Sequence, residues 1–286
     1  MPTTSLKYKT TIWKGSGYVL SSAIASGTFF VLFIGLFLNH ILKQPFLTIR
    51  PSAIYSGSII SIVFLIITIT LLIIDVRGLK LFWQGLTFPQ KGSRLVLGGY
   101  TILIFGILTI LFTLTTWLDL ITFSIILSYL TATAAFITSL STSYILDKRE
   151  KECNWNHFGI TAHMLSHSLM AGAAAFIIAD VFYKIGTTWE FYIDSVLHAS
   201  IILNILITVI EFFVKKSSSH NQVAKELIKG KFKTLFWIGY LLIGNLIPLL
   251  LSILSTSIYL QATSGFLILI GIFIIEQIWI SSPVKQ

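Results

Sequence analysis

Eight long apolar runs constrain this 286-residue chain more than any other feature of its sequence. Each run is close to the roughly 20 residues that a helix needs to cross the hydrocarbon core of a bilayer. Within lipid, a single segment satisfies its own backbone hydrogen bonds only as a helix. The runs therefore predict an all-α integral membrane protein with eight transmembrane helices, at about 17–42, 54–74, 95–117, 119–146, 157–183, 190–214, 234–255 and 257–280. Pro248 is expected to kink the seventh helix.

The composition agrees with a membrane location and limits the cofactors that the chain can hold. Only 11% of the residues are charged, whereas a soluble domain carries about a quarter. A single cysteine, Cys153, cannot ligate an iron–sulfur cluster or close a disulfide. We therefore expect no iron–sulfur cluster and no metal site in this chain, and any such cluster should be on a partner. The basic N-terminus before the first run is interpreted as the flank of a transmembrane helix and not as a signal peptide.

The positive charges predict how the chain is oriented. An even number of spans puts both termini on the same side of the membrane. Only three of the 20 Lys and Arg residues, Lys43, Arg50 and Lys184, fall in loops on the opposite side, and the other 17 lie on the side of the termini. By the positive-inside rule both termini are cytoplasmic, in the cell (cytoplasmic or inner) membrane. The net charge of +9 is thus explained by topology, and we expect no nucleic-acid partner.

A weak internal repeat divides the chain into two halves. Leu20, Ser21 and Gly27 of the first run match Leu165, Ser166 and Gly172 of the fifth at an offset of 145 residues. The third and seventh runs match at an offset of 140, both opening with a Gly-Tyr pair. This pattern predicts two four-helix bundles, 1–147 and 148–286, in a parallel pseudo-repeat within one membrane domain.

Two histidines inside the fifth run are the most informative polar residues, because polar groups in lipid are costly. His163 and His167 lie one turn apart on one helix face and should face protein or water. Either they belong to a hydrogen-bonded network or they lie beside a proton-coupled ligand, since imidazole titrates near neutral pH. A haem held between His40 and His198 is left open as a lesser alternative, although we expect none. The sequence contains no metal motif, carboxylate pair or nucleophile elbow, so no catalytic residue is assigned.

Four segments, in this order, resemble the NrfD-like family, the membrane quinone-interacting subunits of polysulfide-, nitrite- and related reductase complexes. They are Trp13, Tyr18 and Gly27 spaced as W-x4-Y-x8-G, the connection "DVRGLKLFWQGLTFPQKGSRLVLGGY" from Asp75, "LMAGAAAFI" from Leu169, and "LFWIGYLLIGNLIPLLL" from Leu235. The connection departs from the family pattern Gly-Arg-Pro, because Arg77 precedes Gly78 and the proline is absent.

The resemblance implies a subunit that binds quinone or menaquinone near one membrane face. There it would exchange electrons with an iron–sulfur subunit, which in turn serves a catalytic subunit of molybdopterin or haem type. The residues expected at the quinone site are Tyr18, Ser22, Asp75, Arg77, Tyr144 and His163, and those for docking the partner are Lys80, Phe82, Trp83 and Trp237. His163 and His167 are not part of the family pattern. A proton route is expected through His167, Glu211 and Asp194. In many family members the docking face is extracytoplasmic, whereas the charges here favour the cytoplasmic face.

Two other functions compete with this expectation. The first is a polytopic transporter made of two parallel four-helix halves, which would need paired charges or broken helices near the middle of the membrane. Only Asn204, Asn245 and Pro248 offer such features in the sequence. The second is a purely structural anchor without a redox site.

Overall fold

The computed structural model describes residues 12–42, 51–75, 87, 94–153, 157–213, 226–255 and 257–281, and within these ranges it contains helices and no strands. Eight spans are long and apolar enough to cross a membrane, which confirms the all-α, eight-helix prediction. The helices are α1 (Ile12–Leu42), α2 (Pro51–Asp75), α4 (Arg94–Trp117), α5 (Ile121–Cys153), α6 (His157–Tyr183), α7 (Thr187–Phe213), η1 (Leu235–Leu246), α9 (Ile247–Leu254) and α10 (Ile258–Ser281).

Helices α1 and α6 form the centre of the bundle. In each, 72% of the most apolar window is buried, against 28–39% in the other six spans. Their small residues let the two backbones touch. A Cβ added to Gly27 would lie 1.7 Å from the carbonyl oxygen of Ser168, and one added to Gly172 would lie 2.2 Å from the carbonyl carbon of Gly27. Close contact of small residues is how membrane helices gain packing energy without a hydrophobic driving force between them.

The other helices pack around this central pair in similar ways. Helix α2 packs on α1 and α7 on α6; α5 packs on α1 and α10 on α6; α4 pairs with α5, and η1 and α9 pair with α10. The predicted boundary between halves, at residues 147 and 148, falls inside α5, which continues as a helix to Cys153. The parallel pseudo-repeat itself stays a prediction.

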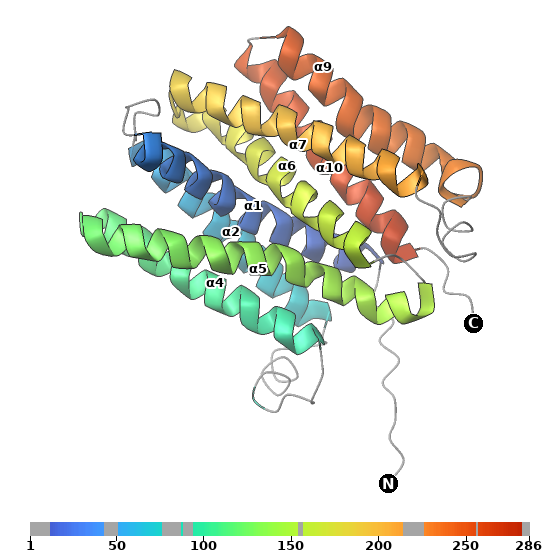
Figure 1. The fold of residues 1–286 in the computed structure, drawn as a ribbon, viewed down its shortest axis with the longest axis horizontal. Helices are drawn as coiled ribbons and strands as arrows, with labels where there is room; N and C mark the ends of the chain where they lie inside the picture. The colour runs from blue at the N-terminus through green and yellow to red at the C-terminus, as the bar shows by residue number, and fades with distance from the viewer. Residues whose placement is uncertain are drawn as a thin grey trace.

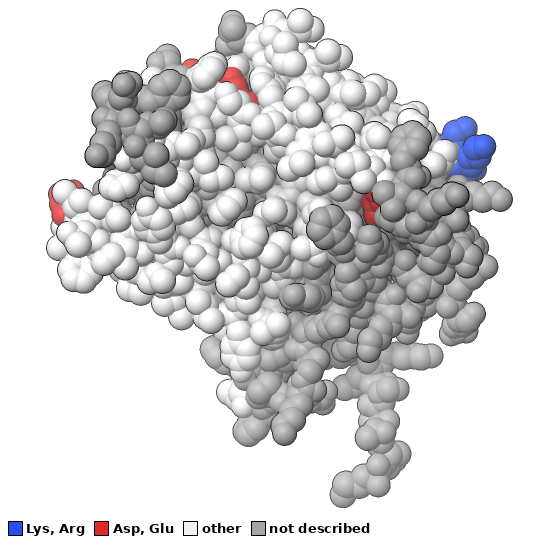
Figure 2. Space-filling model, viewed as in Figure 1, with Lys and Arg blue, Asp and Glu red and all other residues white. Residues whose placement is uncertain are grey.

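The surface of the bundle matches a lipid environment. Large apolar side chains project outward along the spans, including Ile66, Ile107, Phe123 and Leu254. Figure 2 shows one face on which the described charged residues are few and lie toward its edges. Helix α1 begins and α10 ends at the same end of the bundle, which we call the terminal end, and the opposite end is the far end (Figure 1).

The seventh span changes its helical hydrogen bonding partway across. Residues Leu235–Leu246 form a π-helix, and an α-helix begins at Ile247 with Pro248 in its first turn. Proline lacks a backbone N–H, and it is best tolerated at the start of a helix. The change in helix type thus lies next to Pro248, and the kink expected there stays a prediction. Within η1 the Nδ2 of Asn245 donates a hydrogen bond to the carbonyl oxygen of Tyr240 at 2.8 Å.

Candidate functional site

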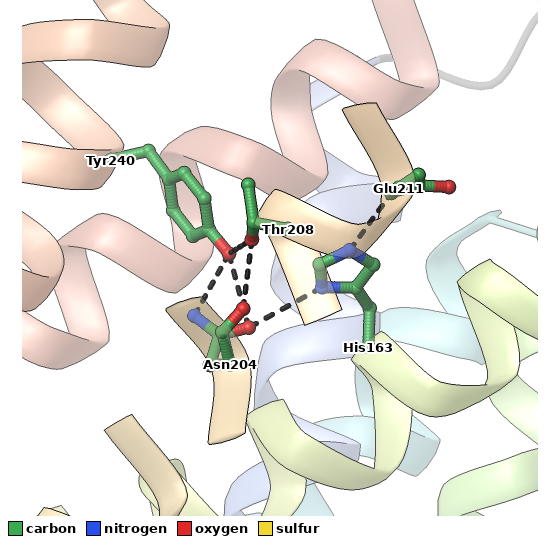
Figure 3. A network of polar contacts seen from close by, with 5 residues as sticks. All are labelled: His163, Asn204, Thr208, Glu211 and Tyr240. Atoms are coloured by element: carbon green, nitrogen blue, oxygen red, sulfur yellow. Dashed lines mark hydrogen bonds and ion pairs between the residues drawn. The ribbon is translucent and has the colours of Figure 1, made fainter. Parts of the chain in front are cut away.

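A network of buried polar side chains lies in the terminal half of the bundle, between α6, α7 and η1 (Figure 3). At its centre is His163, whose side chain is 3% exposed. Its Nε2 is 3.0 Å from Oε2 of Glu211, and its Nδ1 is 3.3 Å from Oδ1 of Asn204. Both partners are on α7, so the histidine holds two points of α7 against α6.

The directions of the hydrogen bonds follow from the backbone carbonyl of Tyr240, which can only accept a hydrogen bond. The carbonyl oxygen of Tyr240 accepts from Nδ2 of Asn245, which leaves Oδ1 of Asn245 to accept from Nδ2 of Asn204 at 2.9 Å. Oδ1 of Asn204 therefore faces His163 as an acceptor. A side-chain amide has one donor end and one acceptor end. It follows that Nδ1 of His163 carries a hydrogen.

One proton is consequently shared between His163 and Glu211. With Nδ1 occupied, either Nε2 donates to a Glu211 carboxylate or a protonated Glu211 donates to Nε2. The two forms have the same net charge: one is an imidazolium facing a carboxylate, and the other is a neutral imidazole facing a carboxylic acid, so exchange moves charge only between these two adjacent groups. The Glu211 side chain is 13% exposed, so it is not fully enclosed. Gly159 makes room for the carboxylate, because a Cβ there would lie 2.6 Å from Oε1.

Two hydroxyl groups extend the network toward η1. The Tyr240 hydroxyl accepts from Nδ2 of Asn204 at 2.8 Å and lies 3.4 Å from Oγ1 of Thr208. Thr208 also donates to the backbone carbonyl of Asn204 at 2.8 Å. All three side chains are buried. The network thus presents amide, phenol and hydroxyl groups beside the histidine–glutamate pair.

Trp279 of α10 forms an aromatic wall beside the two histidines. Its ring stacks on His167 with centroids 5.4 Å apart and planes at 17°, and it meets His163 edge-on at 5.3 Å. The centroids of His163 and His167 are 5.6 Å apart. Histidine rings packed against an aromatic face keep a fixed orientation, which favours directional hydrogen bonding.

An apolar groove of about 570 Å³ runs between α7 and η1 on the lipid-facing side of the network. Thr208 lines this groove and also belongs to the network, so it is the residue shared by the two. The other walls are apolar or aromatic, formed by Ile205, Val209, Ile228, Phe236, Trp237, Leu241, Leu242 and Leu246. Such a groove can take an acyl or isoprenoid chain from the bilayer.

Only some of the residues predicted for the site lie in this network. His163 and Glu211 form its central pair, and His167 lies beside it. Tyr18 and Ser22 are buried on α1. Of Asp75 and Tyr144 only the helical backbone is described, in α2 and α5, and Arg77, Lys80, Phe82 and Trp83 lie outside the described residues.

Asp194 and Trp237, the other two predicted residues, lie elsewhere. Asp194 accepts a hydrogen bond from Nε2 of Gln261 at 3.3 Å. It is about 25 Å along α7 from Glu211, at 1.5 Å per residue. Trp237 is 47% exposed, lines the groove, and donates from Nε1 to the carbonyl oxygen of Ile228 at 3.3 Å.

His40 and His198, the two histidines considered for a haem, have different surroundings. Nε2 of His198 is 2.8 Å from Oγ of Ser252 on α9. His40 lines a cavity of about 760 Å³ at the far end, between α1, α4 and α5, whose wall also includes Asp119 and Tyr129. No cluster of three or more His, Cys, Asp or Glu side chains in the described part of the chain is suited to a metal ion.

Sequence reasoning did not assign Thr208, Tyr240, Asn245 or Trp279 to a site with the two histidines. The two asparagines were considered only as features of a transport site. The usable signal is the cost of an amide in lipid. Because of this cost, Asn204 and Asn245 each need a hydrogen-bond partner. The sequence does not show which helix supplies that partner.

The chain was compared with family models, with curated proteins and with solved structures, and none of the three comparisons found a match.

Proposed function

We propose that this chain is the membrane anchor subunit of a multi-subunit respiratory oxidoreductase, where it binds quinone or quinol. The observation that supports this is the buried His163–Glu211 pair, joined at 3.0 Å, beside an apolar groove that faces lipid. Quinol oxidation releases two electrons and two protons, so its site needs access from lipid and a proton acceptor. Here the groove would give access from lipid, and the His163–Glu211 pair would be the proton acceptor.

The donor set fits a quinone head group. Thr208 lines the groove, and its hydroxyl lies 3.4 Å from that of Tyr240. These two hydroxyls would hold a quinone oxygen. The His163–Glu211 pair would accept a proton, and the exposed edge of Glu211 would release it at the terminal end. The apolar groove would take the isoprenoid tail. When bound, the quinone supplies the two-electron chemistry, and the chain supplies orientation and a path for protons.

This site differs from the one that the NrfD-like resemblance implies. The residues that the resemblance implies come mainly from α1 and the connection after α2, whereas the network is built on α6, α7 and η1. His163, which is not part of the family pattern, is the one residue predicted for the quinone site that lies in the network. The proposal keeps the partners that the resemblance implies. An iron–sulfur subunit would dock at the terminal end, which the loop charges place in the cytoplasm, and pass electrons to a catalytic subunit of molybdopterin or haem type.

The first experiment is purification of the tagged chain from native membranes in mild detergent. Mass spectrometry would identify the co-purifying chains, and organic extraction would measure quinone per chain. We expect an iron–sulfur protein and close to one quinone per chain. We also expect His163→Leu to lower the quinone content and His198→Leu, which removes a histidine outside the network, to leave it unchanged. A chain that purifies alone and without quinone would contradict the proposal.

A transporter is the second candidate, and one observation favours it. The network contains a paired acid and base, His163 and Glu211, and lies against the π-helical segment of η1. Interrupted helices with polar groups inside the membrane are typical of transport sites. Reconstituted vesicles distinguish the two candidates. Proton flux that depends on an added solute, in a chain without quinone, would support transport.

A further inference from the structure

Two fully buried ionisable side chains lie beside the network without belonging to it. Glu276 on α10 is 1% exposed and His167 on α6 is 0% exposed. The Asn204 side chain lies near His167, but neither ring nitrogen makes a hydrogen bond within the described residues, and neither does a carboxyl oxygen of Glu276. Buried polar atoms in proteins are nearly always satisfied, so a pair of such groups indicates a missing water, ion or ligand.

The register of α6 and α10 places Glu276 opposite the turn of α6 that holds both histidines. Gly265 of α10 packs against Ala174 and Ile178 of α6, since a Cβ there would lie 3.0 Å from the carbonyl oxygen of Ala174 and 3.1 Å from Cγ1 of Ile178. Glu276 follows Gly265 by 11 residues, and His163 and His167 precede Ala174 and Ile178 by 11 residues. Eleven residues are about three helical turns, so these side chains return to the facing sides of the two antiparallel helices, about 16 Å nearer the terminal end. Of the two histidines in this turn, His163 is already hydrogen-bonded to Glu211 and Asn204, so His167 is the one left to pair with Glu276.

Trp279 gives an independent check on this register. It lies one turn beyond Glu276 on α10, and its ring contacts both His163 and His167. Glu276 is therefore on the part of α10 that faces the histidines. At this depth the other titratable side chains on the elements packed against the pair are His163, Glu211 and Tyr240, together with Tyr18 on α1.

We propose that Glu276 and His167 form an internal proton-binding site at the α6–α10 interface, bridged by buried water. An ionised carboxylate without a partner is not tolerated in an apolar interior, whereas a carboxylic acid that donates to a water is.

The site can move one proton without any electron transfer. The O–H bond of the Glu276 carboxylic acid breaks as the water accepts that proton, and the water gives one of its own protons to a ring nitrogen of His167. The products are a carboxylate and an imidazolium, and the net charge is unchanged. Because the ring of His167 is 5.6 Å from that of His163, the site adjoins the proton shared with Glu211. It does not require bound quinone.

The test is infrared spectroscopy of the purified full chain in detergent, in ordinary and in heavy water and without added quinone. We expect a carbonyl band of a protonated carboxyl that disappears in Glu276→Gln and shifts in Glu276→Asp and in His167→Gln. The control Glu226→Gln, which removes a carboxyl outside the eight spans, should keep the band.

Three results would overturn the proposal. The first is a wild-type spectrum identical to that of Glu276→Gln, which would mean that Glu276 holds no proton. The second is a band that sodium ions abolish, which would indicate a bound cation instead. The third is a band unchanged by His167→Gln, which would separate the two residues. If Glu276→Gln does not fold, the shift in Glu276→Asp decides the assignment. Quinone content is measured separately, so either proposal can fail alone.

Discussion

At the scale of single residues, the site depends on the order in which its donors and acceptors are joined. The backbone carbonyl of Tyr240 orients Asn245, Asn245 orients Asn204, and Asn204 determines which nitrogen of His163 carries hydrogen. The amide groups of Asn204 and Asn245 each have partners at both the oxygen and the nitrogen end, which fixes the orientation of each amide. A buried polar network of this kind specifies one packing of its helices, because any other packing leaves groups unsatisfied.

Replacing His163 by leucine tests the central pair. The substitution removes the hydrogen bonds that His163 makes to Glu211 and Asn204, and a lost hydrogen bond to a charged group costs about 2 kcal/mol. We expect His163→Leu to lower the unfolding temperature in detergent clearly. His198→Leu, which removes one neutral hydrogen bond to Ser252, should lower it by about half as much. Equal effects of the two substitutions would show that the pair adds no stability of its own.

At the scale of helices, the contact between α1 and α6 determines how the two halves meet. The backbone atoms around Gly27 and Gly172 leave no space for a side chain. Both glycines are inside long helices, where glycine is less stable than alanine. Their presence is explained by the close approach of the two backbones and not by local conformation.

Gly27→Ala is expected to destabilise the bundle by about 3 kcal/mol, since overpacking against backbone cannot be relieved by a rotamer change. The matched control is Gly106→Ala on α4, where an added Cβ would meet only Cδ1 of Leu65, at 3.9 Å. There alanine should be neutral or stabilising by roughly 0.5–1 kcal/mol. Thermal unfolding of both variants in the same detergent measures the difference. A tolerated Gly27→Ala would contradict the close helix contact.

The groove between α7 and η1 gives a test of how a ligand enters. Leu242→Trp would fill the groove beside Thr208, and we expect it to reduce quinone content at least about tenfold, which corresponds to 1.4 kcal/mol. Leu250→Trp adds the same ring on the exposed surface of α9, away from the groove, and should leave the quinone content unchanged. If both variants keep their quinone, quinone does not enter through this groove. The cavity at the far end then becomes the candidate for the quinone site.

At the scale of the whole molecule, the eight spans form one bundle whose outer surface is apolar. The ionisable network is in the terminal half of the second four helices, and the larger cavity is at the far end of the first four. The two features are thus separated both along the membrane normal and across the bundle. A ligand at one would not contact a ligand at the other.

The orientation of the bundle can be tested with single cysteines. In a chain whose Cys153 is replaced by serine, Leu118→Cys places a thiol in the turn between α4 and α5, and Lys229→Cys places one at the terminal end. Both positions are exposed. We expect an impermeant thiol reagent to label Leu118→Cys in intact cells and Lys229→Cys only after lysis. The reverse pattern would put the terminal end outside the cytoplasm. It would show that the distribution of lysines in this chain does not follow the positive-inside rule.

The sequence alone predicted the number of helices and their approximate bounds. Backbone hydrogen bonding in lipid leaves no alternative to a helix, and the length of an apolar run sets its span. The fifth run, predicted as 157–183, is α6 with those bounds, and the seventh differs only in its division into η1 and α9.

Only the tertiary structure decided which polar residues form a site. In a membrane protein both the lipid-facing and the protein-facing sides of a helix are apolar, so the sequence does not show which way Asn204, Tyr240 or Glu276 points. That direction depends on how each helix is rotated and on which helix lies beside it. The sequence therefore determined that these side chains need hydrogen-bond partners. The packing of α6, α7, η1 and α10 determined which residues those partners are.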